Sequence, residues 1–60
     1  MHGFVLIRGT FVIPESFRFT SEACKGQTST WQDDAGRYHA FDFWRRQGWR
    51  VQPAFLELVD

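Results

Sequence analysis

The chain has 60 residues, and its seven Lys and Arg balance seven Asp and Glu for a formal net charge of zero. A chain of this length buries only about 60% of its unfolded surface, so we expect a single small domain over residues 1–60. The neutral charge is unlike that of strongly basic nucleic-acid-binding proteins. Eleven residues are aromatic, which predicts a folded chain because aromatic side chains bury the largest areas.

The cysteine content favours a reducing compartment, and we expect the cytoplasm. Cys24 is the single cysteine and can form no internal disulfide, whereas small secreted domains normally contain several. Arg8 interrupts the apolar run over residues 3–7, which is too short for a signal peptide or a membrane span, so we expect no membrane association. A chain this small without disulfides needs very good packing or a partner subunit.

The first predicted strand covers residues 3–13, which are rich in β-branched and aromatic side chains. Gly9 marks a local bend in one long strand, the favoured interpretation, or forms a tight hairpin turn with Arg8. Both faces of this strand carry apolar residues, so it needs cover on both sides. Pro14 ends it or places it at an edge, and alternation over residues 17–20 predicts a second, shorter strand.

A helix of about 17 residues is predicted in the second half, after a polar segment over residues 21–29 that reads as a loop. Thr30 and Asp33 fit a capping box at the start of this helix. Its end is marked by two cations and a glycine, at Arg45, Arg46 and Gly48. Between these ends, residues suited to one buried stripe recur every three or four positions: Trp31, Ala35, Tyr38, Phe41 and Trp44.

A competing interpretation makes residues 33–36 a turn and residues 37–44 a strand, because Gly36 costs a helix interior about 1 kcal/mol. Strand chemistry resumes at residues 49–51 and 54–59, and Pro53 implies an edge position or a bulge. The predicted element order is therefore β-β-α-β. It forms an α+β fold with a three-stranded, mainly antiparallel sheet and one helix packed on one face.

The other face of such a sheet would expose a large apolar patch, so we expect a homodimer or higher homo-oligomer to cover it. We also place Phe11 and Trp44 in the core, where truncation of either to Ala would cost about 3–5 kcal/mol.

Candidate chemistry is sparse. Cys24 and His39 are the residue types of a thiol nucleophile and its base, and Asp42 follows His39 at a spacing that would orient the ring. We favour the simpler explanation, in which Cys24 is a spare loop thiol and His39 and Asp42 are a solvated pair. Three Cys and His residues are too few for structural zinc, and helix capping accounts for Asp33 and Asp34. We therefore expect no metal, no cofactor and no catalytic residue.

One cluster of arginine and tryptophan gives the candidate binding residues: Arg37, Trp44, Arg45, Arg46, Trp49 and Arg50. The leading hypothesis is a non-catalytic binding or regulatory module that acts as a homo-oligomer. It would grip a protein partner through this cluster and an aromatic sheet face, since Arg and Trp concentrate at interface hot spots.

Three other accounts remain open. The first alternative function is an oligomeric nucleic-acid-binding protein that stacks bases on Trp44 and Trp49 and meets phosphates with Arg45, Arg46 and Arg50. The second is a minimal enzyme with an inter-subunit site around His39. A purely structural account makes both tryptophans core residues and the arginines a cap of the helix end.

Overall fold

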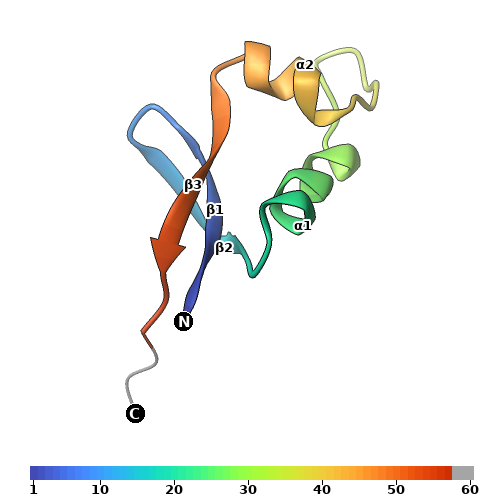
Figure 1. Cartoon of the computed structure of the whole chain (residues 1–60). Helices are drawn as coiled ribbons and strands as arrows, with labels where there is room; N and C mark the ends of the chain where they lie inside the picture. Colours follow the sequence, from blue (N-terminus) through green and yellow to red (C-terminus); the bar gives the residue numbers. More distant parts are fainter. Residues whose placement is uncertain (58–60) are drawn as a thin grey trace.

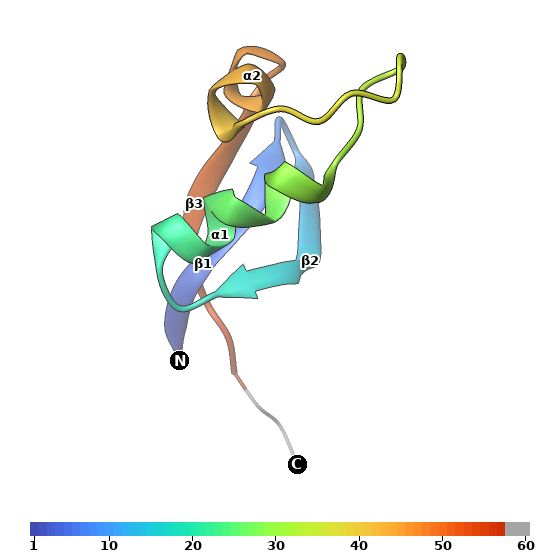
Figure 2. The same cartoon turned by 90° about the vertical axis from the view of Figure 1, so that its right-hand side faces the viewer.

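The computed structural model describes residues 1–57. Its elements are β1 (His2–Arg8), β2 (Phe11–Arg18), α1 (Ser21–Gly26), the 3-10 helix η1 (Gln27–Thr30), α2 (Phe41–Arg46) and β3 (Trp49–Phe55). The strands form one antiparallel sheet in the order β2-β1-β3. Figures 1 and 2 show α1 and η1 across one face of this sheet and α2 beyond one end of it. The predicted α+β fold with a three-stranded antiparallel sheet is confirmed.

The prediction of one long first strand is wrong, because the chain turns back at Gly9. Arg8 pairs directly with Phe11, so a two-residue loop joins β1 to β2. Gly9 has a φ of 61°, the backbone conformation that a type II′ hairpin turn needs at its first central position. The hairpin that the sequence offered as an alternative is therefore the structure. Of the separate short strand predicted at residues 17–20, residues 17 and 18 belong to β2, whereas residues 19 and 20 are not strand.

The pairing of β2 with β1 is irregular, and the side chain of Ser16 compensates for the lost backbone hydrogen bond. The pairing with β1 shifts between Phe4 and Leu6, where β2 carries extra residues around Pro14. The backbone N–H of Leu6 therefore has no strand partner and donates instead to Ser16 Oγ at 2.8 Å. Ser16 Oγ in turn donates to the carbonyl of Ile13 at 2.6 Å, so one buried hydroxyl takes the place of a missing ladder bond.

Helix α1 stands where the sequence predicted a loop. Thr20 caps it, since its Oγ1 accepts a hydrogen bond from the backbone N–H of Ala23 at 3.1 Å. The cap and the helix-forming residues that follow it outweigh the polar composition on which the loop prediction was based. Cys24 is the buried residue of this helix and anchors it to the sheet.

The long helix predicted from Thr30 is wrong over its first half. Residues 31–40 are irregular, with one isolated bridge between Gln32 and Tyr38, and α2 begins only at Phe41. Asp33 does not cap a helix: its Oδ1 accepts the backbone N–H groups of Ala35 and Arg37 at 2.8 and 2.9 Å. The turn over residues 33–36 forms as the competing interpretation proposed, because an aspartate side chain readily bonds backbone groups just ahead of it. The strand that the same interpretation placed over residues 37–44 is wrong, since α2 occupies the second half of that range.

The end of α2 and the following strand agree with the sequence prediction. Arg45 and Arg46 occupy the last turn, and Gly48 has a φ of 101° just after it. Strand β3 contains Pro53 and lies at an edge of the sheet, where a residue without an N–H is tolerated. It ends at Phe55, so Leu56 and Glu57 are not strand, and residues 58 and 59 of the predicted strand lie outside the described residues.

The core centres on β1. The sheet face turned away from the helices is more buried than the sequence predicted. The side chain of Arg8 lies over the ring of Trp49, and this ring contacts Trp31 just after η1. The sheet face that carries Arg8 and Leu6 is therefore the one that the helices cover. Val5 and Ile7 point to the other face, yet they are only 8% and 6% exposed. The register places Gln52 and Arg50 beside them, and long side chains of this kind shield apolar neighbours.

Phe11 is not a core residue, which overturns its predicted large contribution to stability. Its side chain is 63% exposed and touches Trp49 edge to face at 6.1 Å. A Phe11→Ala change therefore removes little buried area and should cost about 1 kcal/mol.

Candidate binding surface at the α2 end

An aromatic cluster holds the end of the molecule formed by the β1–β2 turn, residues 31–40, α2 and the start of β3, here called the α2 end. Trp31 is at its centre, 5.4 Å from the ring of Trp44 and 5.0 Å from that of Trp49. Phe43 adds an edge-to-face contact with Trp44 at 4.9 Å. The cluster fixes α2 and the irregular segment to the sheet. In the predicted helix Trp31 and Trp44 would share one stripe about 20 Å apart, so their contact is a product of the observed fold.

The indole N–H of Trp44 is buried and has no hydrogen-bond partner within residues 1–57. Trp31, His39 and Phe43 all meet the Trp44 ring at steep angles of 75°, 82° and 87°. Edge-to-face packing of this kind brings the positive edge of one ring to the π-face of another, where an N–H is tolerated. Because the nitrogen is closed off from solvent, it serves packing and is not a donor to a bound molecule.

An open cavity of about 280 Å³ lies beside this cluster. Three aromatic rings form part of its wall, those of Phe43, Trp44 and Trp49. The rest of the wall is polar and charged: Arg8, Gln32, Asp33, Asp34 and Gln47. The cavity therefore combines aromatic surface with hydrogen-bonding groups of both kinds, and its wall is more polar than that of most small-ligand pockets.

The structure separates the predicted binding residues into an inner and an outer set. Trp44 and Trp49 are half-buried and line the cavity. Arg45 and Arg46 are exposed on the last turn of α2, and Arg37 is exposed on the irregular segment. Arg50 is also exposed, but it follows Trp49 in β3 and so points to the opposite face of the sheet.

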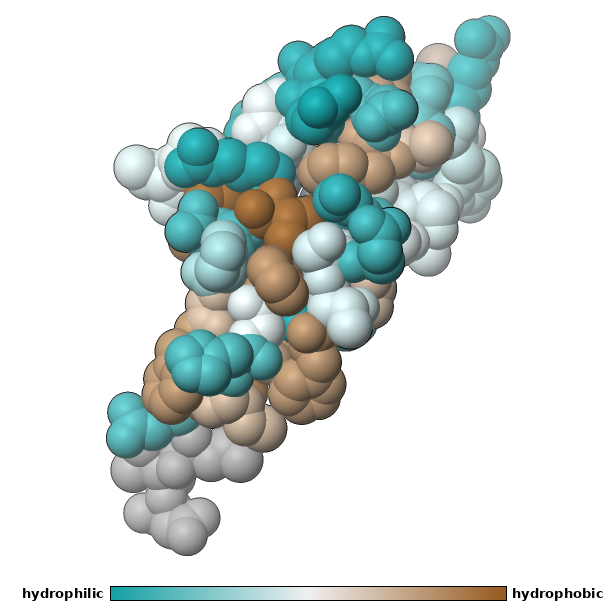
Figure 3. Space-filling model, viewed as in Figure 1, coloured by the Kyte–Doolittle hydropathy of each residue, from teal (hydrophilic) through white to brown (hydrophobic). Residues whose placement is uncertain are grey.

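Positive charge gathers at the α2 end. Figure 3 shows hydrophilic residues concentrated there, whereas the middle and the opposite end carry more apolar residues. The α2 end holds five arginines against three aspartates, although the whole chain is neutral. Arg45 lies 3.7 Å from Asp42 with its side chain 67% exposed, a surface pair of little energetic value. No ion pair within residues 1–57 engages the other four: Arg8, Arg37, Arg46 and Arg50.

His39 pairs with Asp33 and not with Asp42 or Cys24, which corrects the predicted partners. Its Nε2 is 2.7 Å from Asp33 Oδ2, and its ring stacks on Phe43 at 3.7 Å. This hydrogen bond, and next the backbone N–H of Arg37, hold the pKa of the Asp33 carboxyl below its ordinary value. Asp42 instead forms a surface ion pair with Arg45. The His39 and Asp33 pair stabilises the turn over residues 33–39.

Cys24 lies in a different environment from the one predicted. It is fully buried on α1, and its Sγ donates to the carbonyl of Ser16 at 3.5 Å. Burial raises the pKa of the thiol, an effect that the nearby Arg18 guanidinium and a Gln27 hydrogen bond only partly oppose. A thiol with a raised pKa and no exposure is a poor nucleophile, so Cys24 is a packing residue.

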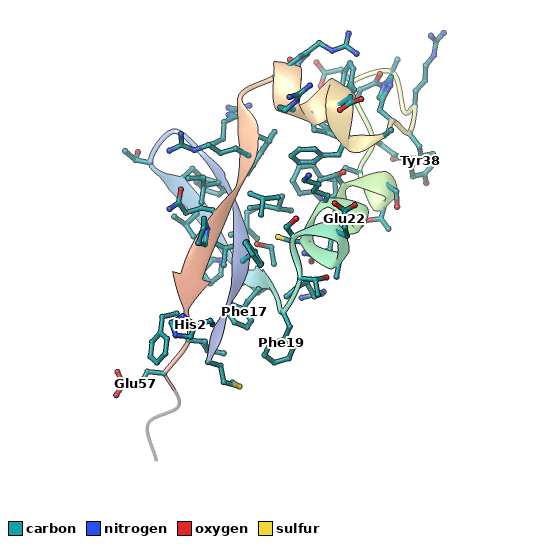
Figure 4. All side chains as sticks on the ribbon, viewed as in Figure 1. His2, Phe17, Phe19, Glu22, Tyr38 and Glu57 are labelled. Carbon is teal, nitrogen blue, oxygen red and sulfur yellow. The ribbon has the colours of Figure 1, made fainter. Side chains whose placement is uncertain are left out.

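The remaining titratable groups form no second site in the described part of the chain. Figure 4 shows His2 at the opposite end of the molecule from Tyr38. Because His39 directly follows Tyr38 in the chain, the two histidines are well separated. Within residues 1–57, no three His, Cys, Asp or Glu side chains gather closely enough to hold a metal ion. No helix in the same range is both long and apolar enough to cross a bilayer.

Several residues of the cavity had no place in the sequence prediction. Arg8 comes from the first strand, and it reaches the cavity because its register partner in β3 is Trp49. Gln32 and Gln47 also line the cavity, but a glutamine in the sequence does not by itself indicate a binding site. Asp34 was assigned to helix capping, and only the competing turn over residues 33–36 pointed to a loop position. Pairing of distant segments was therefore needed to find this wall.

Comparison with known proteins gives no relative from which a function is transferred. No protein-family model matches the chain, no curated protein matches its sequence, and no solved structure matches its fold.

Proposed function

We propose that the chain is a non-catalytic binding module that works as a homo-oligomer in the cytoplasm, with the α2 end as its recognition surface. The observation that supports this is the excess of arginine at that end of a neutral chain, where four arginines besides Arg50 face three aspartates. Ionised side chains that are exposed and unpaired are available to an anionic partner. The aromatic cluster beneath them supplies a rigid platform for such contacts.

The first candidate partner is a protein with an acidic surface. Arginines next to large aromatic rings form the usual hot spots of protein interfaces. A synthetic decaglutamate peptide is a suitable probe, and tryptophan fluorescence reports its binding because Trp44 and Trp49 lie beside the arginines.

Combined replacement of Arg45 and Arg46 by Ala should weaken decaglutamate binding by at least tenfold. The matched control is Arg18→Ala, which removes an exposed arginine of β2 outside the α2 end. Equal losses in the two variants would mean that binding follows overall charge and not this surface, and would contradict the assignment.

The second candidate partner is a single-stranded nucleic acid, and the observation that favours it is the cavity whose wall combines aromatic rings with Arg8. Single strands bind where bases stack on rings and phosphates meet cations. A strand that contacts about four phosphates should lose roughly 50-fold in affinity between about 50 and 200 mM salt. Affinity for an oligonucleotide that stays constant over this range would exclude the candidate.

A further inference from the structure

The cavity at the α2 end contains hydrogen-bonding groups for which the fold supplies no side-chain hydrogen-bond partner. Within residues 1–57, no side-chain hydrogen bond engages Asp34, Gln47 or the guanidinium of Arg8. Asp33 differs, because His39 and two backbone N–H groups occupy its carboxylate. An acceptor, an amide and a cationic donor therefore line the same cavity as the aromatic rings.

The size of the cavity selects a small planar group. Its volume of about 280 Å³ lies just below the range of about 300–1,000 Å³ that drug-sized ligands occupy. Phe43, Trp44 and Trp49 give it flat walls. A single heteroaromatic ring system suits both this volume and these walls.

We propose that this cavity binds one nucleobase, with the attached phosphate held by Arg8, the arginine of its wall. The base stacks against the aromatic wall while Asp34 and Gln47 bond its polar edge. Guanine is the favoured base, since its two adjacent N–H donors match the two oxygens of the Asp34 carboxylate. The proposal deepens the nucleic-acid candidate above and does not depend on the acidic-protein candidate.

An aromatic side chain of a protein partner fits the cavity less well. Such a ring would fill the apolar wall but would leave Asp34, Gln47 and Arg8 without partners as it displaced their water. Each polar group buried without a hydrogen bond costs about 1–3 kcal/mol. The polar groups of the cavity thus favour a ring that itself carries donors and acceptors.

The test uses tryptophan fluorescence of the full chain, titrated with guanosine monophosphate, uridine monophosphate and ribose 5-phosphate. We expect guanosine monophosphate to bind most tightly and ribose 5-phosphate at least tenfold more weakly, because the sugar phosphate lacks a base. Asp34→Asn should remove about tenfold of the affinity for guanosine monophosphate and narrow its advantage over uridine monophosphate. Ribose 5-phosphate binding as tightly as the nucleotides would overturn the proposal.

The matched control is Glu22→Gln, which neutralises an 88% exposed carboxylate on α1, away from the cavity. This variant should bind guanosine monophosphate as the parent does. Asp34 is exposed, so its variant is expected to fold normally, and circular dichroism checks this. If both variants bound guanosine monophosphate equally more weakly than the parent, the effect would follow net charge and the base site would be contradicted.

A second pair of probes separates a free nucleotide from a base within a strand: a guanine-containing single-stranded RNA and an abasic strand of equal length. Tighter binding of the RNA, with loss in Asp34→Asn, supports a base site that reads strands. Binding of mononucleotides but of neither strand keeps the base site and removes the nucleic-acid candidate. Equal binding of both strands keeps that candidate and overturns the base site.

Discussion

Ser16 connects the sheet to α1 through its hydroxyl and its carbonyl. The hydroxyl accepts the N–H of Leu6 and donates to the carbonyl of Ile13. The carbonyl accepts from Gln27 Nε2 at 2.7 Å and from Cys24 Sγ. A small polar residue is required here because the strand pairing breaks at a buried position, where backbone groups still need partners.

Replacement of Ser16 by Ala should lower the free energy of unfolding by about 1–3 kcal/mol, since it leaves the buried N–H of Leu6 without an acceptor. Urea unfolding measures this change. Ser29→Ala is the matched control, because the Ser29 hydroxyl is exposed and bonds only the carbonyl of Gly26. The control should change stability by less than about 0.5 kcal/mol. Similar midpoints for both variants would contradict the role of Ser16.

The thiol of Cys24 should be protected in the folded chain. Full burial and a raised pKa both keep it from reacting as a thiolate. We expect a thiol reagent such as Ellman's reagent to react at least a hundredfold faster in denaturant than in buffer at pH 8. Fast labelling of the native protein would show that α1 does not cover this residue.

At the scale of an element, the segment over residues 31–40 takes its form from Asp33 and the aromatic cluster. The carboxylate of Asp33 bonds the backbone of Ala35 and Arg37 and the ring of His39. The ring of His39 stacks on Phe43 at the start of α2. A side chain that joins a turn to a helix in this way defines the conformation of a segment that has no repeating backbone bonds.

This turn should loosen in acid. Because the pKa of Asp33 is lower in the folded chain than in the unfolded one, its contribution to stability is complete above the unfolded value of about 4. That contribution is lost as the pH falls through the lower, folded pKa. NMR shifts of the Ala35 and Arg37 amides should follow this titration, and in Asp33→Asn they should not. Amide shifts that stay constant between about pH 5 and pH 2 would contradict the argument.

At the scale of the whole molecule, the chain has little interior. Among residues 1–57, only six besides Gly3 are buried: Val5, Leu6, Ile7, Ser16, Cys24 and Thr28. The chain exposes 4610 Å², whereas a compact monomer of 7.1 kDa exposes about 4,100 Å². Large apolar side chains such as Phe11, Val12 and Phe19 remain exposed. This surplus supports the homo-oligomer proposal, even though Val5 and Ile7 are shielded within one chain.

Light scattering at micromolar concentration should give at least twice the mass of one chain. Val12→Lys should shift the protein towards monomer, because Val12 is 47% exposed and pairs with Ile7 on the face that the helices leave open. Tyr38→Lys is the control, a 62% exposed position on the irregular segment, away from that face. A parent protein with the mass of a single chain would contradict the oligomer proposal.

Local chemistry in the sequence determined the strand-forming segments, the edge position of the Pro53 strand and the end of α2 at Gly48. These signals act through the backbone of one or two residues, so they need no knowledge of distant contacts. They were sufficient for the three-stranded antiparallel sheet and the α+β class. The hairpin at Gly9 was visible too, but one glycine cannot distinguish a bend from a turn without the partner strand.

Tertiary structure alone decided the form of residues 31–40 and the assembly of the candidate site. Thr30, Asp33 and the recurring aromatic residues suit a helix, but Trp31 packs against Trp49 of β3 as well as Trp44 of α2. The burial gained by these long-range contacts exceeds the weak preference of a short segment for helix. The cavity likewise exists only because the sheet register sets Arg8 beside Trp49, a pairing across about forty residues of chain.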